Sequence, residues 1–183
     1  DGTGLVVRVA PDGARRVLPT GDLLPDRVLV LPARAHGLLA EAAGRALRSI
    51  ADLLPRIVGG SDDIHHDVDP FAAFADIRTK LSNLDAAAVE AHRERTIRVS
   101  SDPDPDPVVR TVIRVRNDAI MAFRATMTPL PETLQTRLSP LLAAVNAAAA
   151  DFLRAIATAF EERRMPPSLD DYRAAIRAYT AEV

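Results

Sequence analysis

The chain has 183 residues, of which 48% are hydrophobic and 26% are charged, and its formal net charge is −2. A chain of this length and composition can form one compact domain with its own core. Basic and acidic residues balance, and aromatic residues make up only 4%, so nucleic acid is not an expected partner. The absence of cysteine excludes disulfides, thiolate catalysis and cysteine-ligated metals.

Residues 1–32 are predicted to form a short appendage to that domain. Leu5 to Val9 and Arg15 to Leu18 flank the turn Pro11-Asp12-Gly13, a pattern that favours a β-hairpin. Three prolines and a Gly-Asp step interrupt residues 19–32, which indicates a linker. We therefore expect a hairpin or an extended appendage, followed by this linker.

Residues 33–183 are predicted to form a helical bundle domain, because their apolar residues recur at spacings of three and four. The first helix should run from Ala33 to Val58, with Pro55 kinking its last turns, and its inward stripe is Leu39, Ala43, Leu47, Ile50, Leu54 and Ile57. The second helix should open with Asp69 as N-cap and Pro70 as its first residue. Its inward seam is Phe71, Phe74, Ile77, Leu81, Leu84, Ala88 and Ala91.

A third helix should start with the same Asp-Pro device at Asp106-Pro107, and its two apolar stripes predict a central position. A fourth, the longest, should follow Pro131 and reach about Arg163, with Leu134, Leu138, Leu141, Val145, Phe152 and Ile156 facing inward. After Pro166-Pro167, Ser168 and Asp171 predict a capping box for a last helix. The predicted fold class is all-α, an antiparallel bundle of about five helices.

No stretch of the sequence offers the about 20 consecutive apolar residues that cross a bilayer. The nearest candidate, Leu141 to Phe160, contains Asn146, Asp151 and Arg154. The chain as given is therefore expected to be soluble.

The densest group of potential metal ligands is the segment Asp62-Asp63-Ile64-His65-His66-Asp67-Val68-Asp69. Neighbouring histidines point in different directions and no histidine stands at an i, i+4 offset, so a solvated loop is favoured over a metal site. His36 and His92 each stand alone on a helix beside charged residues, and we expect both to be partly exposed. We expect no metal and no other cofactor.

Motifs for nucleophilic catalysis and for nucleotide binding are missing, since the sequence has neither a Gly-x-Ser-x-Gly elbow nor a P-loop. An enzyme is therefore not expected. The arginines of the third helix should reach solvent or pair with acids such as Asp118, and this is favoured over an anion site. Arg110, Arg114 and Arg124 remain the candidate residues for binding an organic anion.

Several segments in order carry a resemblance. Val30-Leu31-Pro32-Ala33-Arg34-Ala35-His36 opens a long helix, and a Gly-Gly break precedes a second long helix that contains Glu90-Ala91-His92-Arg93-Glu94-Arg95. A Pro-Asp-Pro linker then leads to Val115-Arg116-Asn117-Asp118-Ala119-Ile120-Met121-Ala122-Phe123-Arg124-Ala125. From about Val28 to Val183 the chain resembles the soluble region of the fusaric acid resistance (FUSC-like) family, inner-membrane proteins related to the aromatic acid exporters.

The resemblance implies a helical domain on the cytoplasmic side of the bacterial inner membrane. Its partners would be the transmembrane helices of the same full-length protein and further copies of the chain, and its role would be scaffolding or gating during efflux of aromatic or other toxic organic acids. In the family the Leu-Pro-Ala-Arg segment usually follows the last membrane helix directly. Here residues 21–26 precede it, which is a departure from the pattern.

Two other hypotheses remain open. One is a free-standing helical interaction module whose exposed stripe binds a partner helix. The other is a helical bundle that senses organic anions through its arginines.

Overall fold

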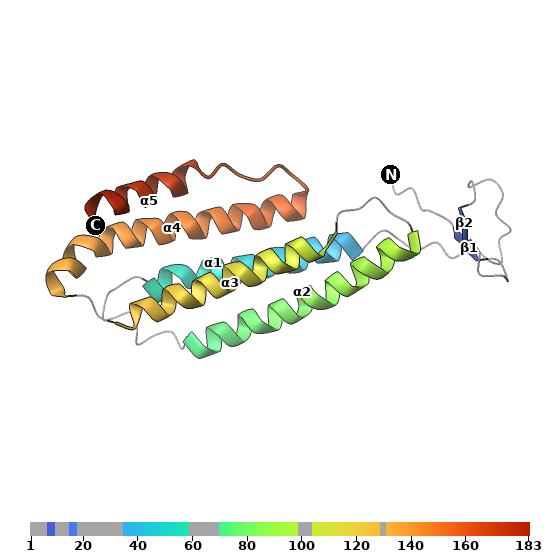
Figure 1. Cartoon of the computed structure of the whole chain (residues 1–183), viewed down its shortest axis with the longest axis horizontal. Coiled ribbons are helices and arrows are strands. Elements are labelled where there is room, and N and C mark those ends of the chain that lie inside the picture. Colours follow the sequence, from blue (N-terminus) through green and yellow to red (C-terminus); the bar gives the residue numbers. More distant parts are fainter. Residues whose placement is uncertain (1–6, 10–14, 18–34, 59–69, 99–103, 129–130) are drawn as a thin grey trace.

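The computed structural model describes residues 7–9, 15–17, 35–58, 70–98, 104–128 and 131–183. These residues form two short strands and five helices (Figure 1). The strands β1 (Val7–Val9) and β2 (Arg15–Val17) pair antiparallel. The predicted turn between the strands, the predicted linker and the predicted N-cap of the second helix lie outside the described residues.

The prediction of an all-α fold is confirmed for the described part of the bundle. Successive helices run in opposite directions (Figure 1). They are α1 (Ala35–Val58), α2 (Pro70–Arg98), α3 (Asp106–Thr126), α4 (Glu132–Glu162) and α5 (Asp170–Glu182). Helix α4 is the longest, as predicted, and α1 continues through Pro55 to its end at Val58.

Helix α1 is the central helix of the bundle, so the prediction that α3 would be central is wrong. Helix α1 packs against α2, α3 and α4, whereas α3 packs against α1 and α2. In α1 small and large apolar side chains cover a wide surface, and the buried ones are Leu39, Ala42, Ala43, Ala46, Leu47, Ile50, Ala51, Leu53 and Leu54. In α3 only Val112 and Ala119 are buried, because arginines and asparagine interrupt its second apolar stripe.

The predicted seam of α2 is confirmed over most of its length. Its buried residues are Ile77, Leu81, Leu84, Ala88 and Ala91. Phe74 is half-buried and meets Phe123 of α3, with ring centroids 5.7 Å apart. This seam holds α2 against α1 and α3.

Helix α4 packs on α1 through its alanine-rich second half. Its buried residues are Leu138, Ala150, Leu153 and Ala157. The prediction that Leu134 faces inward is wrong: this residue is 40% exposed, because it lies in the first turn of α4, away from the buried residues of that second half. Helix α5 packs on α4 and contains no buried residue, and its Tyr172 stacks on Phe152 with ring centroids 6.5 Å apart.

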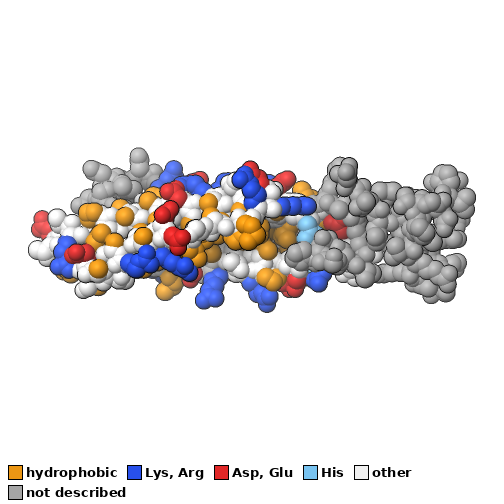
Figure 2. All heavy atoms as spheres, turned by 90° about the horizontal axis from the view of Figure 1, so that it is seen from above, with side chains coloured by type: hydrophobic (Ala, Val, Ile, Leu, Met, Phe, Trp, Pro, Cys, Tyr) orange, Lys and Arg blue, Asp and Glu red, His pale blue; other side chains and the backbone are white. Residues whose placement is uncertain are grey.

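Helix α4 is also, within the described residues, the one helix that length and composition would allow to cross a membrane. Its most apolar 18-residue window has a mean hydropathy of 1.4, and 11% of that window is buried. In the sequence, Asn146, Asp151 and Arg154 argued against a membrane-spanning segment here. Seen from above, the bundle exposes hydrophobic side chains between basic and acidic ones (Figure 2).

The ends of the helices differ from the predicted caps. Helix α3 begins one residue early, with Pro105 as its N-cap, because the Asp106 N–H is bonded to Asp104 Oδ1 at 3.1 Å. Before α5, Ser168 Oγ accepts a hydrogen bond from the N–H of Asp170 at 3.1 Å, so the predicted partnership with Asp171 is wrong. Helix α4 ends at Glu162 on a left-handed residue, Arg163, with φ of 53°.

Two glycines of α1 offer a matched test of how closely α4 approaches. A Cβ at Gly44 would lie 2.6 Å from Glu161 Oε1, whereas a Cβ at Gly37 would have no atom within 4 Å. Gly37→Ala should raise the free energy of unfolding by about 0.5–1 kcal/mol, because alanine favours the helix. The free energy of unfolding of Gly44→Ala should be about 1 kcal/mol lower than that of Gly37→Ala, because the new methyl group displaces the paired carboxylate of Glu161.

Urea unfolding of both variants measures the difference. A double variant, Gly44→Ala with Glu161→Ala, should recover the missing stabilisation relative to Glu161→Ala alone. Equal stabilisation by Gly37→Ala and Gly44→Ala would contradict the close packing of α1 on α4.

Candidate functional site

One end of the bundle brings together the start of α1, the end of α2, the start of α3 and the end of α4 (Figure 1). The Asp-Pro linker reaches this end before α3, and Pro105 is among the fully buried side chains. A proline has a fixed φ, so a buried proline at this point holds the preceding aspartate in place. The polar residues around it form the candidate site.

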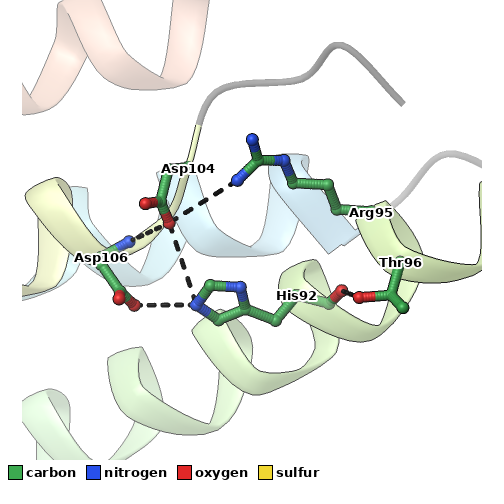
Figure 3. A network of polar contacts seen from close by, with 5 residues as sticks. All are labelled: His92, Arg95, Thr96, Asp104 and Asp106. Carbon is green, nitrogen blue, oxygen red and sulfur yellow. Dashed lines mark hydrogen bonds and ion pairs between the residues drawn. The ribbon is translucent and has the colours of Figure 1, made fainter. Parts of the chain in front are cut away.

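His92 of α2 is the centre of the site (Figure 3). Its Nε2 lies 2.8 Å from Asp106 Oδ1 and 3.9 Å from Asp104 Oδ1. Asp104 Oδ1 also accepts the hydrogen bond from the Asp106 N–H and lies 3.9 Å from Arg95 Nη1. The first turn of α3 is thus joined to the last turns of α2.

The charges of this cluster interact with one another while remaining in contact with water. The hydrogen bond from His92 lowers the pKa of the Asp106 carboxyl, with smaller contributions from the charges of His92 and Arg110. The side chains of His92 and Asp106 remain 43% and 56% exposed, so water screens the pair. The cluster is therefore a solvated link between two helices.

The same three side chains have the donor atoms of a divalent metal site. One ligand atom each from His92, Asp104 and Asp106 lies within 4.8 Å of the others. An imidazole with two carboxylates suits zinc and other first-row metals. In this structure His92 is hydrogen-bonded to Asp106, and Asp104 Oδ1 accepts from the Asp106 N–H and lies 3.9 Å from Arg95, so a metal would have to displace these contacts.

A second polar contact ties α1 into this end. The N–H of Ala35, the first residue of α1, donates to Glu94 Oε2 at 2.9 Å. The first N–H groups of a helix have no partner within the helix, and a carboxylate beside them is stabilising. The last turns of α2 therefore hold the starts of both α1 and α3, through Glu94 and His92.

Charged pairs along the middle of the bundle join α1 to α4. Arg48 and Glu161 form a bidentate pair, with Nη1–Oε1 at 2.5 Å and Nη2–Oε2 at 2.6 Å. Hydrogen bonding by Arg48 lowers the pKa of Glu161. Arg154 Nη2 lies 2.9 Å from Asp52 Oδ1, a second pair between the same two helices.

A similar cluster joins α1 to α2. Ser49 Oγ donates to Asp76 Oδ2 at 2.6 Å, and Lys80 is bonded to both residues. Hydrogen bonds from Lys80 and, to a smaller extent, from Ser49 lower the pKa of Asp76. These residues, with Arg45, Arg48 and Arg56, line an open cavity of about 460 Å³ in which cations and carboxylates largely pair with each other.

The structure places the residues singled out in the sequence as follows. Arg110, Arg114 and Arg124 are all exposed on α3. Arg116 is half-buried and donates to Asn117 Oδ1 at 2.8 Å. The segment from Asp62 to Asp69 lies outside the described residues.

Both histidines are partly exposed, as predicted, but they have partners that the sequence did not indicate. His36 is half-buried and lines a cavity between α1, α3 and α4. His92 was predicted to be partly exposed, which is correct, but also to stand alone, which is wrong. Its partners come from the Asp-Pro linker, and the run of alternating aspartate and proline is the signal that could have indicated them.

Comparison of the chain with protein-family models, with curated proteins and with solved structures finds no match.

The Arg48–Glu161 pair predicts a dependence of stability on pH. Because the pKa of Glu161 is lower in the folded chain than its ordinary 4.5, the stabilisation is complete above that value and is lost as the pH falls through the lower folded-state pKa. Glu161→Gln should lower the free energy of unfolding at neutral pH by about 0.5–1 kcal/mol and reduce its fall in acid. Urea unfolding across the acid range measures both effects. Glu41→Gln, which removes a solvated pair within α1, is the control and should change neither.

The link from α2 to α3 predicts local protection from exchange. Removing the imidazole by His92→Ala should raise hydrogen exchange several-fold at the first amides of α3, because the first turn loses its anchor. Arg93→Ala is the matched control, since Arg93 pairs with Glu90 inside α2. Equal exchange in the two variants would show that the His92–Asp106 contact does not hold the helix.

Proposed function

We propose that this chain is the cytoplasmic helical domain of a FUSC-like inner-membrane efflux transporter for aromatic or other toxic organic acids. In this proposal the bundle packs beneath the membrane helices of the same protein and supports assembly of its copies or gating. The proposal draws on the resemblance of the segments named above and on where they lie in the fold.

The observation that carries the proposal is that three of the resembling segments meet at one end of the bundle, while the fourth, Val115 to Ala125, continues along α3. The first segment leads into the start of α1, the second forms the last turns of α2, and the Pro-Asp-Pro linker precedes α3. Ala35 is bonded to Glu94, and His92 to Asp106, so contacts join all three segments. In the family the first segment follows a membrane helix, and this end would then face the membrane.

This arrangement suits a domain that transmits movement. A displacement of the chain before α1 would act on Ala35, and through Glu94 on the end of α2. The same turns of α2 hold α3 through His92. Long helices packed along their length would carry such a displacement to the opposite end of the bundle.

The experiment that tests the proposal is membrane fractionation of the full-length natural product that contains this segment. After a carbonate wash, we expect the polypeptide in the membrane pellet, because integral helices resist extraction at high pH. Export of aromatic acids by cells that express it is the second measurement. Recovery in the supernatant would overturn the proposal.

A free-standing interaction module is the second candidate function. The favouring observation is that the most apolar window of α4 is only 11% buried, and that Met121, Met127 and Leu134 are exposed. Apolar surface of this kind is typical of helices that bind a partner. Recovery of the full-length product in the supernatant, together with self-association on sedimentation, would favour this function over the transporter.

A further inference from the structure

A cavity of about 580 Å³ opens between α1, α3 and the end of α4. Its wall is apolar, and it is formed by Leu39, Ala40, Val108, Ile156, Ala159 and Phe160. Its polar lining residues are His36, Asp104, Arg163 and Arg164, and the last three are exposed, so they form its mouth. A concave apolar site of this volume with a few polar groups at one side is typical of small-molecule binding sites.

The cavity is built from the helices themselves. Leu39 is 5% exposed and belongs to the core, and Val108, Ile156 and Phe160 pack against that core. Ala40 of α1 and Ala159 of α4 line it with small side chains, which leave space that larger residues would fill. A site whose floor is made of core side chains keeps its shape in solution.

The mouth of the cavity favours an anion. Arg164 is paired with Glu162, and Asp104 is engaged by His92 and Arg95. Within the described residues no carboxylate pairs with Arg163, so its charge is available to a ligand. A guanidinium offers two parallel donors, a geometry that matches a carboxylate.

Arg163 occupies a position that glycine would fill at lower cost. It has φ of 53°, and within the described residues it is the only residue other than glycine with positive φ. The left-handed conformation lets its N–H cap the carbonyls of Ala159 and Phe160. Glycine is the usual residue at such a cap, so the arginine side chain is retained here at some cost to stability.

We propose that this cavity binds an amphipathic carboxylate with a flexible alkyl body. The carboxylate pairs with Arg163 at the mouth, and the alkyl body lies along Leu39, Val108 and Phe160. An alkyl body fits because the wall is mostly aliphatic, with one aromatic ring. The site is made by this chain alone, so it stands whether or not the chain belongs to a membrane transporter.

The test is isothermal titration calorimetry of the 183-residue chain with sodium decanoate below its micelle concentration. We expect saturable binding at one site. Decanol, which has the same body without the charge, should bind about tenfold more weakly or less, because the charge-assisted hydrogen bonds to Arg163 are missing. Decylammonium, with the opposite charge, should bind more weakly still. Absence of decanoate binding, or equal binding of decanoate and decanol, would overturn the proposal.

Three variants assign the binding to this cavity. Arg163→Gly should weaken decanoate binding about tenfold or more, and it should keep or raise the unfolding temperature because glycine suits the left-handed cap. Ala159→Leu should abolish binding by filling the apolar space. Arg177→Gln, an equal loss of charge on the exposed face of α5, is the control and should bind as the parent chain does. Unchanged affinity in Arg163→Gly would overturn the assignment, and the membrane fractionation of the full-length product is independent of this result.

Discussion

The close approach of helices to α1 is the constraint on which the rest of the structure depends. Ala43, Ala46 and Ile50 of this helix have no exposed surface, and three neighbouring helices meet its wide apolar face. Small residues let the backbones come near enough for many weak contacts to add up. Gly44 shows the limit, since even a Cβ there would press on Glu161 of α4.

The register between α1 and α4 is fixed by charged pairs. Alanine-rich surfaces are smooth and by themselves leave the register between helices poorly fixed. The pairs Arg48–Glu161 and Arg154–Asp52 supply that register, because each joins one position on α1 to one position on α4.

The number of helices, their type and the inward face of α2 could be read from the sequence, because spacing of three and four and the Asp-Pro and Gly-Gly steps are local signals. Which helix occupies the centre of the bundle could not be predicted from the sequence. The two stripes of α3 look more apolar than the alanines of α1. An alanine buries little area of its own, but it lets a neighbouring helix pack closely. The spacing of apolar residues along a sequence does not show how closely two helices pack. The candidate site could not be predicted from local signals either. His92 and Asp106 are 14 residues apart and meet because α2 packs against α3, which is a tertiary contact.

The candidate site around His92 and the cavity beside it share the residue Asp104, so the contacts of the site affect the charge at the cavity. Asp104 accepts from the N–H of Asp106, faces His92 and Arg95, and also stands at the mouth of the cavity. With its carboxylate occupied in this way, Asp104 adds little repulsion toward an anionic ligand. Arg163, which also lines the cavity, pairs with no carboxylate within the described residues. The geometry of the α2–α3 link therefore sets the charge that a ligand would meet.

Helix α5 stands apart from this scheme, since it packs on α4 and contains no buried residue. Its attachment rests on the stacking of Phe152 with Tyr172 and on contacts such as that between Arg137 and Glu182. Burial couples a segment to the global folding reaction, so we expect α5 to separate from α4 at a lower free energy than the other four helices unfold. Such a separation would uncover the surface of α4 beneath α5 without unfolding the core.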